Sequence, residues 1–297
     1  MSTAPVVAAA AQTRSMAYVA LTKPDVSFLV VLTTLAGYGL AARGPLDWMR
    51  MLHAVFGTTL IAAGTSALNH YLERDSDARM RRTASRPLPS GVLQPLEVLL
   101  FGGSLILGGA LYLWIATNAL ATTVAVAASA CYLLVYTPLK PHTTLATMVG
   151  AFPGAAPPLI GWAAARGHLG LDAWILFAIL FLWQFPHFQS IAWMYREDYA
   201  RAGIKMLPVV DRDGRRTFRQ ILLTAAALIP VSLLPAVTGL ADVRYFFGAG
   251  VLGLLLIGVC LWAQSSKTNV LAKWLMHATV LHLPLLLGLL WWDKIPR

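Results

Sequence analysis

Charged residues are concentrated in one segment of an otherwise apolar chain, residues 68–91, which read LNHYLERDSDARMRRTASRPLPSG. Within it Asn69, Glu73 and Asp77 stand four residues apart, so on a helix they lie along one face that drifts slowly around the axis. Mg²⁺ prefers oxygen ligands, keeps several waters and often shares the phosphates of a substrate. We therefore predict a Mg²⁺ site at this helix end. Asp75 lies on another side of such a helix and is a less suitable ligand of the same ion.

A run of arginines follows these acids directly, at positions 79, 81, 82 and 86. Guanidinium groups bind phosphate oxygens in a bidentate manner. Acids that hold a metal, followed by arginines that hold phosphate, predict a metal–diphosphate site, and the RPLPSG sequence predicts a tight turn after it. The alternative is a solvated loop in which the arginines and acids pair with one another, and the spacing of the whole set disfavours it.

A second polar region covers residues 183–210, WQFPHFQSIAWMYREDYARAGIKMLPVV. Gln184, His187 and Gln189 fall inside an apolar stretch, where polar groups are costly and often functional. Pro186 interrupts the helical hydrogen bonding nearby. A structural and a functional role both stay open for His187. Two roles also stay open for Lys140, in YTPLKPHTT: it is either a lysine that marks a cytoplasmic turn or a residue of the site.

The composition indicates a membrane protein. Of the 297 residues 58% are hydrophobic and 12% are charged, whereas soluble domains carry about 25% charged residues. Apolar stretches near the ~20 residues that span a bilayer recur along the chain, with a turn expected at 117–118. Backbone groups in lipid must be satisfied within the segment. The predicted fold is all-α, a polytopic membrane helix bundle with nine transmembrane helices at 26–43, 51–71, 97–117, 119–138, 144–165, 173–194, 219–240, 245–265 and 274–292.

The distribution of lysine and arginine predicts the orientation. With nine spans, every basic cluster falls on the side of the N-terminus, and such clusters mark cytoplasmic loops. Residues 1–25 are then a loose cytoplasmic tail, and 26–297 form one transmembrane domain with catalytic cytoplasmic loops at 72–96 and 195–218. No organelle presequence is evident, which favours a bacterial inner membrane. The net charge of +10 belongs to these loops, so it does not indicate a nucleic-acid partner.

The motifs resemble a known family. The stripe of Asn69, Glu73 and Asp77, followed by MRRTASRPLPSG, resembles the first aspartate-rich motif of the UbiA superfamily of intramembrane prenyltransferases. Four further segments, YTPLK, GAAPPLIGW, WQFPHF and YREDYARAGIKMLPVV, resemble the branch of that superfamily that farnesylates heme. The resemblance covers nearly the whole chain, and its motifs stand in the family order.

The resemblance implies a helix bundle around a central cavity and a Mg²⁺-dependent transfer of farnesyl from farnesyl diphosphate to a vinyl group of heme b, giving heme O. It implies that Asn69, Glu73 and Asp77 hold Mg²⁺ and that the diphosphate is held by Arg81, Arg82, Arg86 and Lys140. It also suggests a neighbouring heme A synthase as a partner.

Two departures from the family pattern affect the site. Glu73 stands where the superfamily usually has Asp, and this longer carboxylate can still bind Mg²⁺. The second acidic motif is degenerate, which leaves Asp198 as its metal and catalytic candidate, with Glu197 in reserve. The remaining substrate-binding candidates are Tyr136, Gln184, His187, Tyr195 and Lys205.

Two other functions compete with this interpretation. One is a prenyltransferase for an aromatic acceptor such as a quinone precursor, which the WQFPHF segment and the reduced second motif disfavour. The other is a transporter or a heme-handling protein without chemistry. Transporters usually place their charged sites near the middle of the membrane, whereas the charges here follow the ends of spans.

Overall fold

A computed structural model describes residues 13–295 of the chain. Its helices are α1 (Arg14–Leu21), α2 (Pro24–Ala41), α3 (Trp48–Asp77), α4 (Pro95–Ala116), α5 (Ala119–Ala130), the π-helical turn η1 (Cys131–Tyr136), α6 (Thr137–Leu139), α7 (Ala146–Ala155), α8 (Pro157–Arg166), α9 (Leu171–Met194), α10 (Arg196–Arg201), α11 (Leu207–Val210), α12 (Arg215–Val237), α13 (Val243–Ser266) and α14 (Asn269–Trp292).

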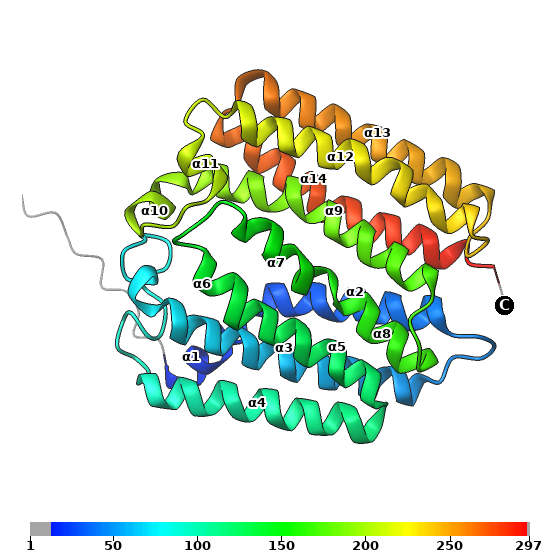
Figure 1. The fold of residues 1–297 in the computed structure, drawn as a ribbon, viewed down its shortest axis with the longest axis horizontal. Coiled ribbons are helices and arrows are strands. Elements are labelled where there is room, and N and C mark those ends of the chain that lie inside the picture. Colours follow the sequence, from blue (N-terminus) through cyan, green and yellow to red (C-terminus); the bar gives the residue numbers. More distant parts are fainter. Residues whose placement is uncertain (1–12, 296–297) are drawn as a thin grey trace, which may run out of the picture.

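The long helices run side by side as one bundle (Figure 1). Within the described residues, eight helical segments are long and apolar enough to cross a membrane. Because lipid cannot satisfy backbone polar groups, hydrogen bonding within each helix is what allows these segments to span it. The predicted class, an all-α polytopic membrane bundle, is confirmed.

The span expected at 144–165 is the exception, because it is divided into α7 and α8 at Ala156. Pro157 has no N–H to donate to the carbonyl of Pro153, and the N–H of Ala156 bonds that carbonyl instead at 3.3 Å. The two short helices follow one another along the bundle (Figure 1). The prediction of an uninterrupted span was therefore wrong here, although α7 and α8 together still run along the bundle.

Close helix packing holds α8 against α2. A Cβ atom at Gly161 would lie 2.1 Å from the carbonyl oxygen of Thr34, and one at Gly37 would lie 2.2 Å from that of Pro158. Only glycine fits at these two contacts, as is common where membrane helices approach closely. The expected turn at 117–118 is also present, and the Asn118 side chain caps α5 by accepting from the N–H of Ala121 at 2.9 Å.

The segment before the first span is ordered where it is described. In α1, Ala17 and Leu21 are fully buried in a cluster with residues of α3 and α4, and Arg14 forms an ion pair with Glu97 of α4. The expectation of a loose tail was thus wrong for residues 13–25, and the rest of the predicted tail lies outside the described residues. Lys23 joins α1 to α2 with a left-handed backbone, φ 48°.

Candidate active site

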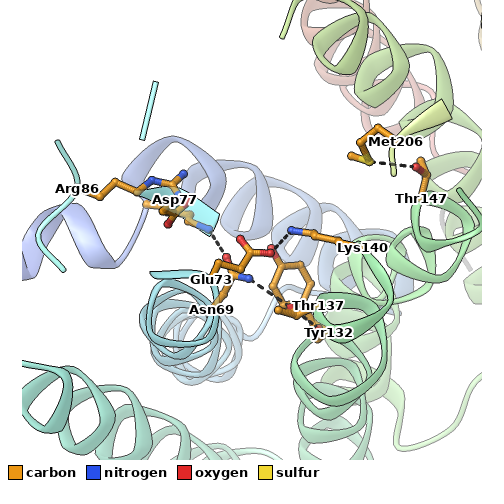
Figure 2. Close-up of polar contacts among 10 residues, drawn as sticks. Asn69, Glu73, Asp77, Arg86, Tyr132, Thr137, Lys140, Thr147 and Met206 are labelled. Carbon is orange, nitrogen blue, oxygen red and sulfur yellow. Dashed lines mark hydrogen bonds and ion pairs between the residues drawn. The ribbon is translucent and has the colours of Figure 1, made fainter. Parts of the chain in front are cut away.

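The three candidate metal ligands lie along the last turns of α3. Asn69 and Asp77 are fully buried, and the side chain of Glu73 is 13% exposed. Each of the three accepts a hydrogen bond from a cationic side chain: Lys23 Nζ lies 2.7 Å from Asn69 Oδ1, Lys140 Nζ 2.6 Å from Glu73 Oε1, and Arg86 Nη1 2.7 Å from Asp77 Oδ2. Figure 2 shows Lys140 reaching Glu73 from another segment, and Arg86 beside Asp77. Each of the three candidate oxygen ligands is therefore paired with a cationic side chain from another segment.

The local electrostatics differ for the two lysines. Burial, together with the charge of Arg86, lowers the pKa of Lys23 to about 7. Burial also disfavours the charge of Lys140, but the neighbouring Tyr136 and Glu73 outweigh it and raise the pKa of Lys140 well above its ordinary value. Lys140 is consequently positively charged at neutral pH. Lys23 loses its proton more readily, because burial disfavours its charged form.

The loop after α3 meets the loop after α9. The backbone N–H of Arg82 donates to Asp198 Oδ2 at 3.4 Å, and the guanidinium of Arg82 lies 4.9 Å from the ring centroid of Tyr195. Asp198 also forms an ion pair with Arg201, one turn later in α10. Two segments that are more than a hundred residues apart in sequence therefore share one polar cluster at the same end of the bundle (Figure 1).

A cavity of about 320 Å³ lies beside this cluster. Its polar lining includes Lys23, Tyr136 and Tyr199, and much of the rest is aliphatic or small, as at Val30 and Ile160. Residues of α2, α3, α5, η1, α7 and α9 all contribute to it. The cavity thus combines a charged margin with an apolar body.

In the second polar region, residues 183–210, Gln184 and His187 bond to other helices and not to charged side chains. Gln184 lines the cavity, but its amide nitrogen donates to the carbonyls of Ala151 and Leu180. The His187 ring stacks on Trp183 at 5.0 Å between centroids and bonds the Thr279 hydroxyl at 2.9 Å, and it is absent from the cavity lining. These two side chains brace α9 against α7 and α14.

The remaining candidates lie at the surface of this end. Arg81, Arg82 and Tyr195 are exposed, and Glu197 is exposed as well. Lys205 contacts the site region through its backbone N–H, which donates to the carbonyl of Lys140 at 2.9 Å. The structure therefore brings Asn69, Glu73, Asp77, Arg86 and Lys140 into one cluster, places Tyr136 on the adjoining cavity wall, and sets Asp198 at its edge.

Three side chains at the site escaped the sequence interpretation. Lys23 belongs to the segment taken as a tail, although its place directly before a proline that starts a span is a usable signal. Tyr132 precedes Tyr136 by four residues and shares the cavity wall with it. Tyr199 follows Tyr195 by the same interval and also lines the cavity.

The donor set fits a hard divalent cation. One amide oxygen and two carboxylates face a common set of cationic groups, and Mg²⁺ accepts such oxygens while leaving positions for phosphate and water. Within residues 13–295 there is no group of three or more His, Cys, Asp and Glu side chains that could hold a metal ion. A divalent cation held here would need the Asn69 oxygen in addition to the two carboxylates.

Comparison with known proteins identifies the family. The model of the UbiA prenyltransferase family matches residues 30–291. The chain belongs to this family. Among solved structures, the UbiA fold is seen in a digeranylgeranylglyceryl phosphate synthase (TM-score 0.78, 17% identity, 94% of this chain and 98% of that one) and in a UbiA homologue from Archaeoglobus fulgidus bound to DMAPP and Mg²⁺ (TM-score 0.62, 15% identity, 92% and 98%).

Sequence relatives within the UbiA family are more similar. A protoheme IX farnesyltransferase of Solibacter usitatus is 48% identical over 93% of this chain and 98% of its own length. A protein of the same name from Koribacter versatilis is 47% identical, with 93% of each chain covered. The UbiA-type membrane domain is thus shared over nearly the full length of both relatives.

Proposed function

We propose that this protein transfers a farnesyl group from farnesyl diphosphate to a vinyl group of heme b, with addition of water, to give heme O. The observation that carries the proposal is the pairing of Asn69, Glu73 and Asp77 with Lys23, Lys140 and Arg86 at the margin of an apolar cavity. The acceptor is chosen because the relatives at 47–48% identity are named protoheme IX farnesyltransferases. This favours heme over the aromatic acceptor considered above.

The three ligands and their cationic partners exchange contacts when substrate binds. Mg²⁺, when bound at Asn69, Glu73 and Asp77, supplies positive charge to the diphosphate oxygens. Lys140 and Arg86 then release their carboxylate partners and turn toward the diphosphate, with Arg81 and Arg82 reaching it from the loop. The positive charges gathered there stabilise the diphosphate as it leaves, which is usually the largest contribution to catalysis of this kind.

The apolar cavity determines the fate of the farnesyl group. As the C–O bond to the diphosphate breaks, the allylic carbon becomes cationic, and the electron pair of the heme vinyl group forms the new C–C bond. Water adds to the resulting carbocation and loses a proton, which leaves a hydroxyethylfarnesyl side chain. The aliphatic lining around Val30 and Ile160 keeps water from the allylic cation before the C–C bond forms.

The loop at 195–218 supports the site although its acidic motif is incomplete. Asp198 holds α10 against the backbone of Arg82, so it positions the arginine loop and is the one second-motif acid that a further Mg²⁺ ion could use. Tyr136, Gln184, Tyr195 and Lys205 form the substrate-binding surroundings. A direct contact between His187 and heme is not part of the proposal, because the imidazole lies between Trp183 and Thr279.

The orientation follows from the diphosphate. Farnesyl diphosphate has one charged end, which stays in the aqueous phase that supplies it, so the site end of the bundle faces the cytoplasm. The bundle itself lies in a bacterial inner membrane, which the sequence favours. Heme O then leaves within the membrane, where a heme A synthase is a suitable recipient.

The test compares two aspartates on the same helix end. Asp77→Ala removes a ligand and leaves the Arg86 guanidinium without its carboxylate, so heme O formation from heme b and farnesyl diphosphate with Mg²⁺ falls by about 10²–10³-fold. Asp75→Ala is the matched control, because the Asp75 side chain is 80% exposed and 3.9 Å from Arg74. Mass spectrometry of the extracted hemes gives the yield. Equal activity of the two variants contradicts the metal-site assignment.

A further inference from the structure

The amide of Asn69 has two ends, and only one of them can bind a cation. Its oxygen Oδ1 accepts from Lys23 Nζ at 2.7 Å, and its nitrogen Nδ2 donates to the Thr137 hydroxyl at 3.2 Å. The two ends of an amide are similar in size, so hydrogen bonding decides which way the group faces. A flipped amide would present N–H groups to the metal position and repel the ion.

The Thr137 hydroxyl is itself committed to one direction. Its hydrogen is donated to the backbone carbonyl of Tyr132 at 2.9 Å, which leaves the oxygen to accept from Asn69. Thr137 is 7% exposed and Asn69 is fully buried, so both bonds are shielded from bulk solvent. Figure 2 shows Thr137 and Tyr132 next to Asn69 and below Glu73 and Lys140.

The Tyr132 carbonyl lies within reach of the Thr137 side chain because the helix changes locally from α to π geometry. In η1 the N–H of Thr137 bonds the carbonyl five residues earlier, that of Tyr132, and Pro138 next to it has no N–H with which to continue the regular ladder. Isolated π-helical turns of this kind are frequent at functional sites. Tyr132 and Tyr136 both face the cavity across this turn.

We propose that Thr137 is a positioning residue that fixes the Asn69 amide with its oxygen toward the metal position, through the carbonyl of the π-helical turn. The hydrogen bonds run in one direction, from Lys23 to Asn69, from Asn69 to Thr137 and from Thr137 to Tyr132. When the cation displaces Lys23 from Oδ1, the bond to Thr137 remains and the amide keeps its orientation. This inference rests on the proposed function, because it assumes that Asn69 is a metal ligand.

The test measures metal-dependent binding, using the purified full-length protein and farnesyl thiodiphosphate, which reacts far more slowly than the diphosphate. Calorimetric titrations at several Mg²⁺ concentrations give the Mg²⁺ concentration required for half-maximal binding of the analogue. Thr137→Val keeps the shape and removes the hydroxyl, so this concentration rises about tenfold or more, as is usual when a group that orients a metal ligand is lost. Thr137→Ser retains the hydroxyl and binds like the unmodified protein.

Steady-state kinetics provide a second readout. Because Thr137 acts on metal binding, the turnover of Thr137→Val returns to near the unmodified value at saturating Mg²⁺. Thr33→Val is the matched control: Thr33 is a buried threonine that donates to the Leu29 carbonyl at 2.7 Å and is absent from the cavity lining. Its Mg²⁺ requirement is unchanged.

A double-mutant cycle with Asn69→Ala decides whether Thr137 works through Asn69. In the Asn69→Ala background Thr137→Val causes no further loss; an equal loss in both backgrounds, or an unchanged Mg²⁺ requirement in Thr137→Val, overturns the proposal. Thr137→Ala serves in the same cycle if the valine variant does not yield folded protein. If the unmodified protein itself shows no Mg²⁺-dependent binding of the analogue, the metal site fails and the role of Thr137 fails with it.

Discussion

The C-terminal halves of α3 and α9 both carry polar side chains inside a long membrane helix, yet these side chains have different partners. On α3, Asn69, Glu73 and Asp77 all point to cationic side chains from other segments. On α9, Gln184 bonds backbone carbonyls and His187 bonds Thr279. Gln189 pairs with Gln220 of α12 at 2.7 Å. The polar residues of α3 are therefore paired with charged side chains, whereas those of α9 chiefly join it to neighbouring helices.

The first prediction, with the largest effect, contrasts an acid of each region. Glu73→Gln removes the carboxylate that Lys140 contacts and one charge from the metal position, so kcat falls by about 10²–10³-fold. Glu197→Gln changes the reserve acid of the second region, which is exposed, and leaves kcat within about twofold. Steady-state assays of heme O formation measure both. Comparable losses would mean that the second region takes part in the chemistry.

The second prediction concerns the helix-joining role of His187. Replacing His187 by Ala removes its hydrogen bond and its stacking on Trp183, so the free energy of unfolding in detergent falls by about 1–3 kcal/mol. Heme affinity and the heme absorption spectrum stay unchanged. Thr279→Val removes the partner of the same bond at 2.9 Å, and the two losses are less than additive in the double variant. A shifted heme spectrum in His187→Ala would place the imidazole in the site after all.

The third and smallest effect is expected at Asp211, between α11 and α12. Burial alone raises the pKa of Asp211, but its carboxylate accepts from the Thr217 N–H at 2.7 Å and hydroxyl at 2.8 Å, and these bonds hold the pKa below its ordinary value near 3.8. The charged form therefore contributes stability above the unfolded pKa, and this is lost as the pH falls through the folded pKa.

The variant Asp211→Asn isolates that contribution. At neutral pH it lowers the free energy of unfolding by about 1 kcal/mol, as expected when hydrogen bonds to a carboxylate in the first turn of a helix are weakened. The difference from the unmodified protein shrinks as the pH is lowered below about 4. Denaturation in detergent across this range measures it, and a difference that does not depend on pH would show that the charge of Asp211 has no part in holding the start of α12.

The sequence was sufficient for what depends on local pattern. Hydropathy located eight of the nine expected spans, and the four-residue spacing placed Asn69, Glu73 and Asp77 on one helix. It was insufficient where the outcome depends on packing between distant segments. Lys23 reaches Asn69 across 46 residues, and the direction in which His187 points depends on how α9 is rotated against α14. The break between α7 and α8 at Ala156 did have a local signal, the Pro157–Pro158 pair. The apolar run at 144–165 was long enough for one span, and this outweighed the signal.

Lys23 combines a left-handed backbone with a hydrogen bond to the candidate site. Glycine adopts φ near 48° without the steric cost that a lysine bears there, and burial also disfavours the charge of the lysine amino group. Replacing Lys23 by Gly would remove both costs and the amino group with them. The same change would leave the buried Oδ1 atom of Asn69 without the donor that lies 2.7 Å from it, so relief of the backbone at this position would come with the loss of a contact to the candidate metal ligand.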